Sequence, residues 1–294
     1  MSLINLHPPK KECNNKTMIK LSIITINYND ATGLKKTLDS VAAQTYANIQ
    51  YVIVDGNSSD NSKNIILDYA EKTKNLNHEI LWISEPDKGI YNAMNKGIRM
   101  ATGDYIQILN SGDLLASNNV TERMVCQLSQ NDESVGILYG NMIKANAQGK
   151  VVGKSGYTEY SLRQFYQSTL NHDCAYIRKD LFEEYGLYDE NLKIVSDWKW
   201  YLQAIGLGRV KPMYVDIDVT IFDDGGISET NLALRNAERR QVLEELLPPA
   251  VLWDYDTHAF EMEQMNRLRR WKLYPLVYFM ERVCFKFEKW FCKR

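Results

Sequence analysis

The sequence predicts an α/β protein with a mostly parallel central sheet, helices on both faces of the sheet and a helical C-terminal extension. Between residues 20 and 115, short runs rich in β-branched apolar residues alternate with segments of helical periodicity, a pattern typical of parallel strands joined by crossover helices. Polar residues follow these runs, at the strand ends where such folds bind ligands. From residue 229 onward almost every segment has helical periodicity.

The elements follow one another regularly in the first half of the chain. We expect strands at 20–26, 50–54, 79–83 and 105–109, and helices at 31–41, 60–74 and 90–101. In the first helix Leu34, Leu38 and Val41 fall on one face. The second half is less regular, with a helix at 117–129, a strand at 137–140, a turn containing Gly149, two helices within 180–206 and an extended pair at 209–222. Pro248-Pro249 and Pro275 break the helical tail.

Composition excludes several classes of protein. With 35 basic and 37 acidic side chains the chain is nearly neutral, which argues against a nucleic-acid partner. Its five cysteines contain no Cys-X-X-Cys pair, so neither a disulfide framework nor a zinc finger is expected and a reducing cytoplasm fits. The first twenty residues lack the apolar stretch of a secretory signal, and no run is long enough to span a membrane.

The most informative junction is at residues 105–113, where an apolar strand runs into Asn110 and Asp113. A carboxylate at a buried strand end is well placed to hold a metal-bound diphosphate. The polar residues at the other strand ends, Asn27, Asp55 and Ser84-Glu85, belong to the same edge of the predicted sheet. The sequence therefore favours a nucleotide-sugar site there.

Several motifs together resemble family 2 of the inverting glycosyltransferases. They are 25–29 (TINYN), 54–60 (VDGNSSD), 85–91 (EPDKGIY), 101–105 (ATGDY), 109–113, His172, 185–190 (YGLYDE) and 196–198 (SDW). The resemblance covers roughly residues 20–228. It implies a Rossmann-like GT-A fold, a nucleotide-diphosphate sugar donor and a divalent metal. The corresponding domains are an N-terminal extension (1–19), a catalytic domain (20–228, with a nucleotide-binding half 20–115 and an acceptor half 116–228) and a helical extension (229–294).

The resemblance assigns the donor site to Asn27, Tyr28, Asp55, Asp87, Lys88 and Asn110. Tyr28 would pack on the base and Asp55 would accept the uracil N3 proton; alternatively, Asp55 only starts a turn and caps the next helix. Asp87 would contact sugar or ribose, or simply complement the helix start. Lys88 would neutralise phosphate, or be solvated.

The metal site departs from the family pattern. Asn110-Ser111-Gly112-Asp113 stands where relatives carry Asp-any-Asp, so Asp113 would bind Mn²⁺ or Mg²⁺ with substrate phosphates and waters as the other ligands. The alternative for Asp113 is a helix N-cap. Gly56 replaces a second aspartate of many relatives. Asp216-Ile217-Asp218 lies in an extended apolar run and is interpreted as structural.

For catalysis the resemblance points to Asp197 as the base that deprotonates the acceptor hydroxyl. The alternative is an ordinary helix cap. Trp198 offers aromatic surface for a sugar, and His172 lies near the donor sugar or acceptor, or is structural. Asp224 belongs to a glycine-containing loop, residues 222–228, expected over the acceptor, with a tight turn as the alternative.

The tail combines an apolar helical stripe with basic residues. Residues 267–294 contain nine Lys or Arg and two Glu. The stripe comprises Leu273, Leu276, Val277, Met280, Val283, Cys284, Phe287, Trp290 and Phe291. This mixture suits an interfacial helix on anionic lipid, although docking on the catalytic domain or a partner subunit explains it too.

The sequence thus predicts a metal-dependent inverting glycosyltransferase that moves a sugar from a UDP-sugar to a saccharide or lipid-linked saccharide. It would act in the cytoplasm, at the inner face of the plasma membrane. Two alternatives remain. One is a catalytically weak sugar-nucleotide-binding protein, suggested by the carboxylates missing from the metal motif at 110–113, and the other is a nucleotidyltransferase. The latter calls for a glycine-rich basic phosphate loop, which is absent after the first strand.

Overall fold

A computed structural model describes residues 18–73, 78–131, 135–145, 151–156, 158–223, 231–270, 272 and 274–291. The chain divides into two compact units, the first ending at Arg239 and the second beginning at Arg240. The division falls inside a helix, eleven residues beyond the boundary expected at 228. The two units are described separately.

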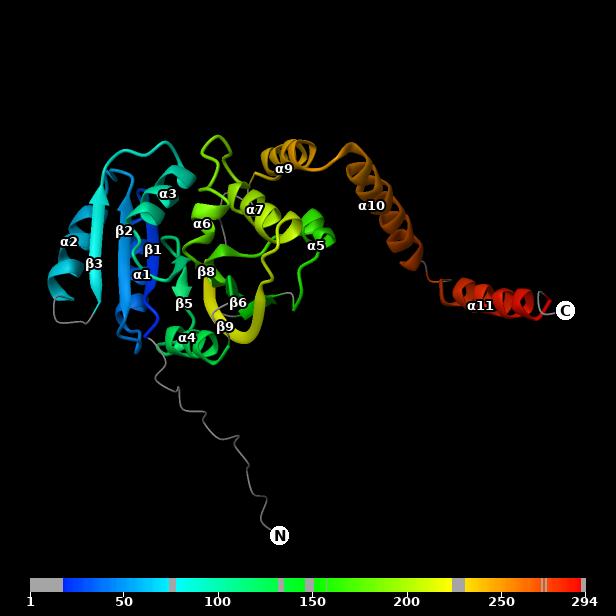
Figure 1. Cartoon of the computed structure of the whole chain (residues 1–294), viewed down its shortest axis with the longest axis horizontal. Helices are drawn as coiled ribbons and strands as arrows, with labels where there is room; N and C mark the ends of the chain where they lie inside the picture. The colour runs from blue at the N-terminus through cyan, green and yellow to red at the C-terminus, as the bar shows by residue number, and fades with distance from the viewer. Residues whose placement is uncertain are drawn as a thin grey trace, which may run out of the picture. The chain divides into compact units, whose positions relative to one another are not determined.

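The first half of the first unit is an alternating, fully parallel arrangement (Figure 1). Its elements are β1 (Leu21–Asn27), α1 (Ala31–Ala42), β2 (Ile49–Asp55), α2 (Ser62–Lys72), β3 (Glu79–Ser84), α3 (Ile90–Met100) and β4 (Tyr105–Ile108). The strand order is β3-β2-β1-β4, and every pair is parallel. The predicted alternation is confirmed, with element ends displaced by one or two residues.

Strand register brings the polar strand ends together. Asn27 pairs with Asp55, and Asp55 pairs with Ser84. These three residues close β1, β2 and β3. The expected row of polar groups at one edge of the sheet is therefore a direct consequence of parallel pairing.

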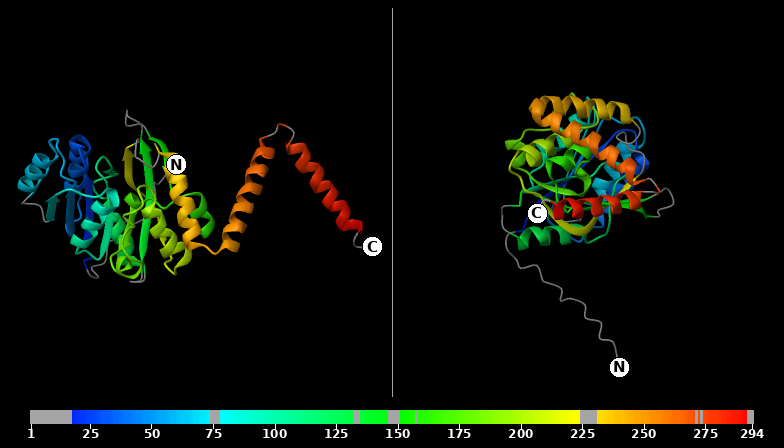
Figure 2. Two further views of the ribbon diagram at one scale, coloured as in Figure 1. Left: turned by 90° about the horizontal axis from the view of Figure 1, so that it is seen from above. Right: turned by 90° about the vertical axis from the view of Figure 1, so that its right-hand side faces the viewer.

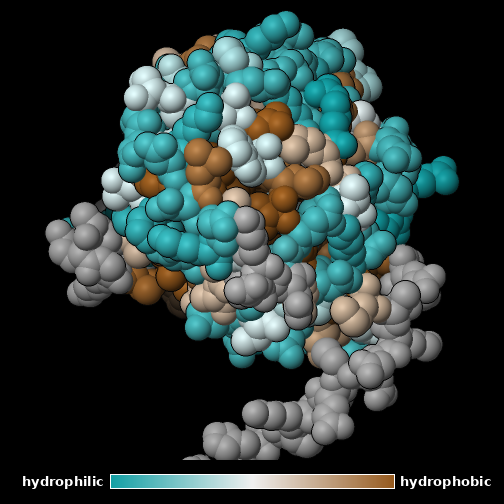
Figure 3. All heavy atoms as spheres, turned by 90° about the vertical axis from the view of Figure 1, so that its left-hand side faces the viewer, coloured by the Kyte–Doolittle hydropathy of each residue, from teal (hydrophilic) through white to brown (hydrophobic). Residues whose placement is uncertain are grey.

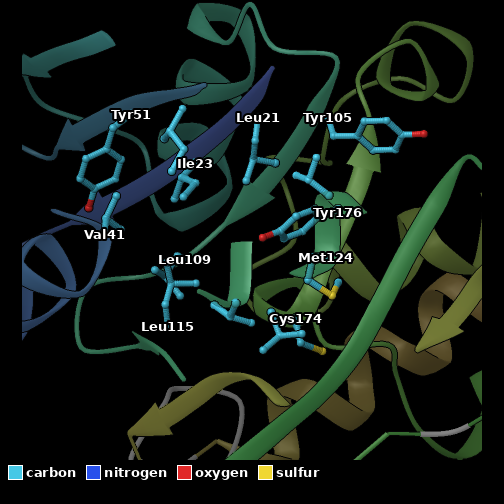
Figure 4. Packing of buried hydrophobic residues seen from close by; sticks show 14 of the residues in the cluster. Leu21, Ile23, Val41, Tyr51, Tyr105, Leu109, Leu115, Met124, Cys174 and Tyr176 are labelled. Carbon is cyan, nitrogen blue, oxygen red and sulfur yellow. The ribbon is translucent and has the colours of Figure 1, made fainter. Parts of the chain in front are cut away.

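Helices cover both faces of this sheet, because alternate strand residues point to opposite sides. Leu21 and Ile23 of β1 share one hydrophobic cluster with Val41 of α1 (Figure 4). On the other face α3 packs so closely that a Cβ at Gly97 would overlap Ile24. On the side of α2 and the edge strand β3, apolar side chains gather in a hollow within a mostly hydrophilic surface (Figure 3).

The second half extends the sheet in the order β4-β8-β6-β9-β5, with β7 paired to β6. Only β6 and β9 are parallel here. The elements are β5 (Leu114–Leu115), α4 (Val120–Gln130), β6 (Ile137–Ala145), β7 (Val151–Ser155), α5 (Leu162–Gln167), a 3-10 turn (His172–Cys174), β8 (Ala175–Arg178), α6 (Leu181–Glu184), α7 (Ser196–Tyr201), a π-helical segment (Leu202–Leu207) and β9 (Met213–Asp223). The extended pair expected at 209–222 is one long strand, because β9 pairs along its length with β6.

Three helices follow: α9 (Leu232–Leu246), α10 (Pro249–Arg269) and α11 (Tyr274–Phe291), drawn in yellow-orange to red (Figure 2). Pro249 and Pro275 lie in the first turns of their helices, where a missing N–H costs nothing. Among the described residues no helix is long and apolar enough to cross a membrane.

Two cysteines within the described ranges are free thiols: Cys174 is buried and Cys284 is exposed.

Candidate active site

Two hollows of the first unit meet at the carboxyl ends of the parallel strands. The larger, here called the strand-end chamber, measures about 840 Å³ and is walled by the ends of β1 and β2, the start of α3 and the turn after β4. The smaller measures about 510 Å³ and is called the basic chamber because it is lined by Lys144, Lys154, Arg235 and Arg239. Both chambers share the wall residues His172, Ile194, Asp197 and Phe222.

The polar row at the strand ends is centred on the carboxylate of Asp55, which is fully buried. It accepts hydrogen bonds from Asn27 Nδ2 (2.8 Å), Ser84 Oγ (2.7 Å) and both the backbone N–H (3.0 Å) and the hydroxyl of Ser58. Burial alone would raise the pKa of Asp55, but these hydrogen bonds outweigh it and lower the pKa. Asp55 lines neither chamber and braces Asn27, which lines the strand-end chamber.

Tyr28 and Asp87 face the strand-end chamber. The ring of Tyr28 is 67 % exposed, so an aromatic face is open to a ligand. Asp87 Oδ1 accepts the N–H of Gly89 (2.9 Å) just before α3, as the helix-start alternative requires, while still lining the chamber. A Cβ at Gly56 would overlap the carboxylate of Asp87, so the glycine at this position fits the close packing. Lys88 is exposed and lines neither chamber.

The turn after β4 supplies Asn110 and Ser111 to the strand-end chamber and Asp113 to the basic chamber. Asp113 is only 4 % exposed. Thr37 of α1 fixes the turn: its hydroxyl donates to Asp113 O (2.8 Å) and accepts the N–H of Gly112 (3.0 Å). Asp113 precedes the short strand β5, so the helix N-cap considered as its alternative role is wrong.

Few protein groups are available as ligands for a metal ion. Within the described residues, no group of three or more His, Cys, Asp or Glu side chains could hold a metal ion. Asp113 nevertheless presents a carboxylate to the basic chamber. Mg²⁺ and Mn²⁺ accept one carboxylate when phosphate oxygens and water complete their coordination, so the residues present fit a metal that arrives with a diphosphate.

Asp197 sits in the shared wall, held by side chains from both halves of the sheet. Tyr91 of α3 donates its hydroxyl to Asp197 Oδ1 (2.9 Å), and His172 Nδ1 donates to Oδ2 (2.9 Å). The side chains of His172 and Asp197 are 20 % and 13 % exposed. Each carboxylate oxygen keeps a lone pair for a further hydrogen bond, so Asp197 can still receive a substrate hydroxyl.

Electrostatics make this contact an ion pair at neutral pH. Burial alone would lower the pKa of His172, but Asp197, Asp173 and Asp113 outweigh it and raise the pKa to about 9. Burial alone would raise the pKa of Asp197, yet hydrogen bonds and charge from His172 and the hydroxyl of Tyr91 lower it. Asp197 is therefore ionised and poised to accept a proton.

The other nitrogen of His172 links this pair to the turn after β4. Its Nε2 lies 3.0 Å from Asn110 Nδ2, which suits neutral histidine, because Nε2 then accepts. Protonated His172 donates from both nitrogens, and only a reversed Asn110 amide would then present an acceptor, Oδ1, which in the present orientation is buried without a hydrogen-bond partner among the described residues. The protonation state of His172 is thereby coupled to a residue of the strand-end chamber.

Glu238 of α9 fixes the loop that leads into α7 and Asp197, a contact that the sequence did not reveal. Its carboxylate is 6 % exposed and accepts the backbone N–H groups of Lys193 (2.7 Å), Ile194 (2.9 Å) and Val195 (3.3 Å). These residues directly precede α7. This contact explains why α9 up to Arg239 belongs to the first unit.

Trp198 lines the basic chamber but is 1 % exposed, and its Nε1 donates to Phe165 O (2.7 Å). The guanidinium carbon of Arg239 lies 4.9 Å from the Trp198 ring centroid. A sugar in this chamber would contact Arg239 before it contacts the indole ring of Trp198. Arg239 was not predicted from the sequence, although the helical spacing of Arg235 and Arg239 places both residues on one face of the helix. Asp224 lies outside the described residues.

Asp216 and Asp218 have ion-pair partners on β7. Lys154 Nζ lies 3.2 Å from Asp216 Oδ1 and 2.7 Å from Asp218 Oδ1, and Asn141 donates to both carboxylates. This agrees with their interpretation as structural residues of β9.

A Rossmann-like parallel half, continued by a mixed sheet and hollowed where the two meet, is the GT-A arrangement of glycosyltransferases, and solved structures share it. One is Staphylococcus aureus TarS in complex with UDP, with a TM-score of 0.58 and 19 % identity over 77 % of this chain and 70 % of that one. Another is a mannosyltransferase of Pyrobaculum calidifontis with GDP-Man and Mn²⁺, with a TM-score of 0.58 and 18 % identity over 77 % and 64 %.

The chain belongs to glycosyl transferase family 2, whose sequence profile matches residues 22–186. A PGL/p-HBAD biosynthesis glycosyltransferase of Mycobacterium bovis is 27 % identical over 210 residues, covering 71 % of this chain and 79 % of that protein. The resemblance inferred from the motifs is confirmed, as is the fold class. The protein is a glycosyltransferase.

Proposed function

We propose that this glycosyltransferase moves a sugar from a UDP-sugar to a hydroxyl of a saccharide or lipid-linked saccharide, with inversion at the anomeric carbon. The nucleoside and sugar of the donor occupy the strand-end chamber, its diphosphate reaches Asp113 on the inner wall of the basic chamber, and the acceptor occupies the remainder of the basic chamber. The observation that carries the proposal is the position of Asp197 in the wall common to both chambers. A base for inversion must reach the acceptor oxygen on the side of the sugar opposite the leaving diphosphate.

On the donor side, the exposed ring of Tyr28 stacks on the uracil and the Asn27 amide contacts the nucleoside. Asp87 and Asn110 face the sugar end of the same chamber. Asp55, enclosed by four hydrogen bonds, acts on the nucleotide by holding Asn27 in place. Lys88 at the exposed start of α3 adds positive charge near the chamber without lining it. UDP as the nucleotide is supported by the complex of TarS with UDP.

In the reaction, the acceptor hydroxyl donates a hydrogen bond to Asp197 and transfers its proton there as the new glycosidic bond forms. Tyr91 and His172 hold the carboxylate in its position. His172, protonated at neutral pH, also contributes positive charge at the boundary where the leaving diphosphate gains charge. When Mn²⁺ or Mg²⁺ is bound, Asp113 holds it, and the metal supplies charge neutralisation for the diphosphate.

The test separates donor binding from transfer. Thermal unfolding is measured with UDP, GDP and their sugars, with and without Mn²⁺, for the wild type, Asp113→Ala and Asp197→Asn. Release of UDP from UDP-sugar, with water as acceptor, is measured in parallel. We expect Asp113→Ala to lose the Mn²⁺-dependent stabilisation by UDP. Asp197→Asn keeps it and loses about 10²- to 10⁴-fold in turnover.

Three outcomes oppose the proposal. Unchanged turnover in Asp197→Asn would show that Asp197 is not the catalytic base. UDP binding without any sugar release in the wild type favours the sugar-nucleotide-binding alternative. Transfer of a nucleotidyl group, detected as labelled UMP on the product, would favour a nucleotidyltransferase.

We infer further that the enzyme works at the inner face of the plasma membrane through α11. Leu276, Val277, Met280 and Val283 of this helix are exposed, and the last turn of α10 carries Arg267 and Arg269. Exposed apolar side chains beside a basic cluster suit an anionic lipid surface, which is where a lipid-linked acceptor would be met.

Sedimentation with vesicles tests this contact. The full chain should sediment with vesicles containing phosphatidylglycerol and much less with phosphatidylcholine alone. Deletion of residues 267–294 should abolish sedimentation while leaving UDP-dependent thermal stabilisation intact. Equal sedimentation of the truncated chain would contradict membrane contact through this segment.

A further inference from the structure

The cations of the basic chamber come from two separate elements. Lys144 and Lys154 come from the β6–β7 pair, and Arg235 and Arg239 come from α9, one helical turn apart on the same face. All four line the chamber whose inner wall holds Asp113, His172 and Asp197. The chamber thus has a catalytic end and a cationic end.

The cations differ in how far the protein itself neutralises them. Lys154 is paired with two carboxylates of β9. Lys144 lies over the ring of Phe222, 5.7 Å from its centroid. Arg239 makes no ion pair with any described residue; it stacks on Trp198 and donates one hydrogen bond to Ser168 O (3.3 Å). Its Nε is buried and makes no hydrogen bond within the described part of the chain.

The placement of Arg239 is electrostatically costly without a ligand. Burial, and then the neighbouring charge of Arg235, lower the pKa of Arg239, while the charge of Asp197 acts in the opposite direction. A half-buried guanidinium next to a second guanidinium, with an Nε that has no acceptor among the described residues, is a favourable position for a further anion. Two planar guanidinium groups are also the geometry that best matches an oxyanion.

The proposed arrangement places the nucleoside and sugar of the donor in the strand-end chamber and its diphosphate at Asp113, on the inner wall of the basic chamber. That diphosphate leaves from the face of the sugar opposite Asp197, whereas Arg235 and Arg239 form the cationic end of the basic chamber. Arg239 rests on Trp198, the residue after Asp197 in α7. An anion bound here lies beside the base, on the acceptor side of the shared wall.

We propose that the basic chamber selects an acceptor carrying an oxyanion, a phosphate or a carboxylate close to the reacting sugar, which Arg239 and Arg235 bind. This inference rests on the proposed function for the assignment of the chamber to the acceptor. The shared chemistry is a tetrahedral or planar oxyanion on a saccharide. A phosphate corresponds to a sugar joined to a phosphorylated carrier, and a carboxylate to an acidic sugar residue.

The test uses three matched probes: glucose, glucose 1-phosphate and glucuronate. Ligand-detected NMR titrations are run on the full chain with UDP and Mn²⁺ present, so that the strand-end chamber is filled. We expect at least one anionic probe to bind about tenfold or more tightly than glucose. The preferred anion identifies the phosphate or the carboxylate class.

Arg239→Gln should lose this preference by about tenfold, and Arg239→Lys should recover only part of it, since lysine lacks the planar fork. Arg240→Gln is the control: Arg240 is the next residue of α9, but pairs with Glu244 and Asp256 away from the chamber. Thermal unfolding without ligand establishes that the variants are folded.

Equal binding of glucose and both anions, or an unchanged preference in Arg239→Gln, would overturn the inference. Failure of the proposed function gives a different pattern. In that case UDP does not stabilise the protein or Asp197→Asn retains turnover, whatever the three probes do. Arg239→Gln should keep the UDP-dependent stabilisation of the wild type, because Arg239 does not line the strand-end chamber.

Discussion

The two chambers that meet at Asp197 differ in how their walls are built. The strand-end chamber takes its polar groups from parallel strands that pair in register, so Asn27 and its brace Asp55 are aligned by backbone geometry. The basic chamber is assembled from side chains of β6, β7, α7 and α9, which lie far apart along the chain. The first wall is a property of the sheet; the second depends on individual contacts.

The chemistry of the chambers differs in the same way. The strand-end chamber offers amides, hydroxyls, an exposed aromatic ring, carboxylates and the single lysine Lys193, while the basic chamber offers four Lys or Arg side chains. Under the proposed assignment, we therefore expect substitutions in the basic chamber to change the choice of acceptor without disturbing the sheet beside the donor. Asp197 is the point of contact, since Tyr91 reaches it from α3 and His172 from the turn before β8.

The largest effect is expected at His172, which belongs to both walls. Its pKa is raised from 6.5 to about 9 in the folded protein, so its stabilising contribution is complete below pH 6.5 and is lost as pH rises through 9. The contribution is on the order of 3 kcal/mol. Urea unfolding between pH 6 and 10 should show this loss in the wild type and a flatter profile in His172→Gln.

His78→Gln is the matched control for this measurement. Burial lowers the pKa of His78, so its titration makes the protein less stable as pH falls, the opposite sign. The alkaline loss of stability should therefore persist in His78→Gln. A wild-type profile that is flat from pH 6.5 to 9 would show that His172 and Asp197 do not form an ion pair.

A smaller effect, confined to one chamber, is expected at Tyr28. Stacking of a base on an aromatic ring contributes about 1–3 kcal/mol, so Tyr28→Ala should weaken UDP binding by about 10- to 100-fold in calorimetric titrations. Tyr28→Phe retains the ring and should bind UDP like the wild type. Anionic probes of the basic chamber should bind all three proteins equally. Unaltered UDP affinity in Tyr28→Ala would assign the base to another surface.

The sequence predicted the strand-end wall better than the basic one, for a physical reason. Short apolar runs that alternate with helical segments locate β1 to β3, and parallel pairing then places Asn27, Asp55 and Ser84 side by side. That local pattern did not reveal that the carboxylate of Asp55 accepts hydrogen bonds from Asn27, Ser58 and Ser84 inside the protein. Burial of a strand end depends on the neighbouring chain segments as well as on the strand.

The contacts around Asp197 could not be predicted from local sequence patterns. Tyr91 and Asp197 are 106 residues apart, and Glu238 reaches back more than forty residues to the loop before α7. Nothing in helical periodicity fixes which loop an acidic side chain of α9 will cap. Tyr91 belongs to the motif at 85–91, yet only the packing of α3 against the second half gives it a role.

The smallest effect is expected at Tyr91, where one hydrogen bond joins the two halves. The hydroxyl of Tyr91 helps, after His172, to lower the pKa of Asp197, so Tyr91→Phe should raise that pKa and move the acid limb of the turnover profile to higher pH. The loss of one hydrogen bond to a carboxylate should cost about tenfold in turnover. Tyr188→Phe is the control, because Tyr188 packs on Tyr91 with its ring centroid 5.7 Å away and its buried hydroxyl has no partner among the described residues. An acid limb that moves equally in both variants would mean that packing, and not the hydrogen bond from α3, sets the proton affinity of Asp197.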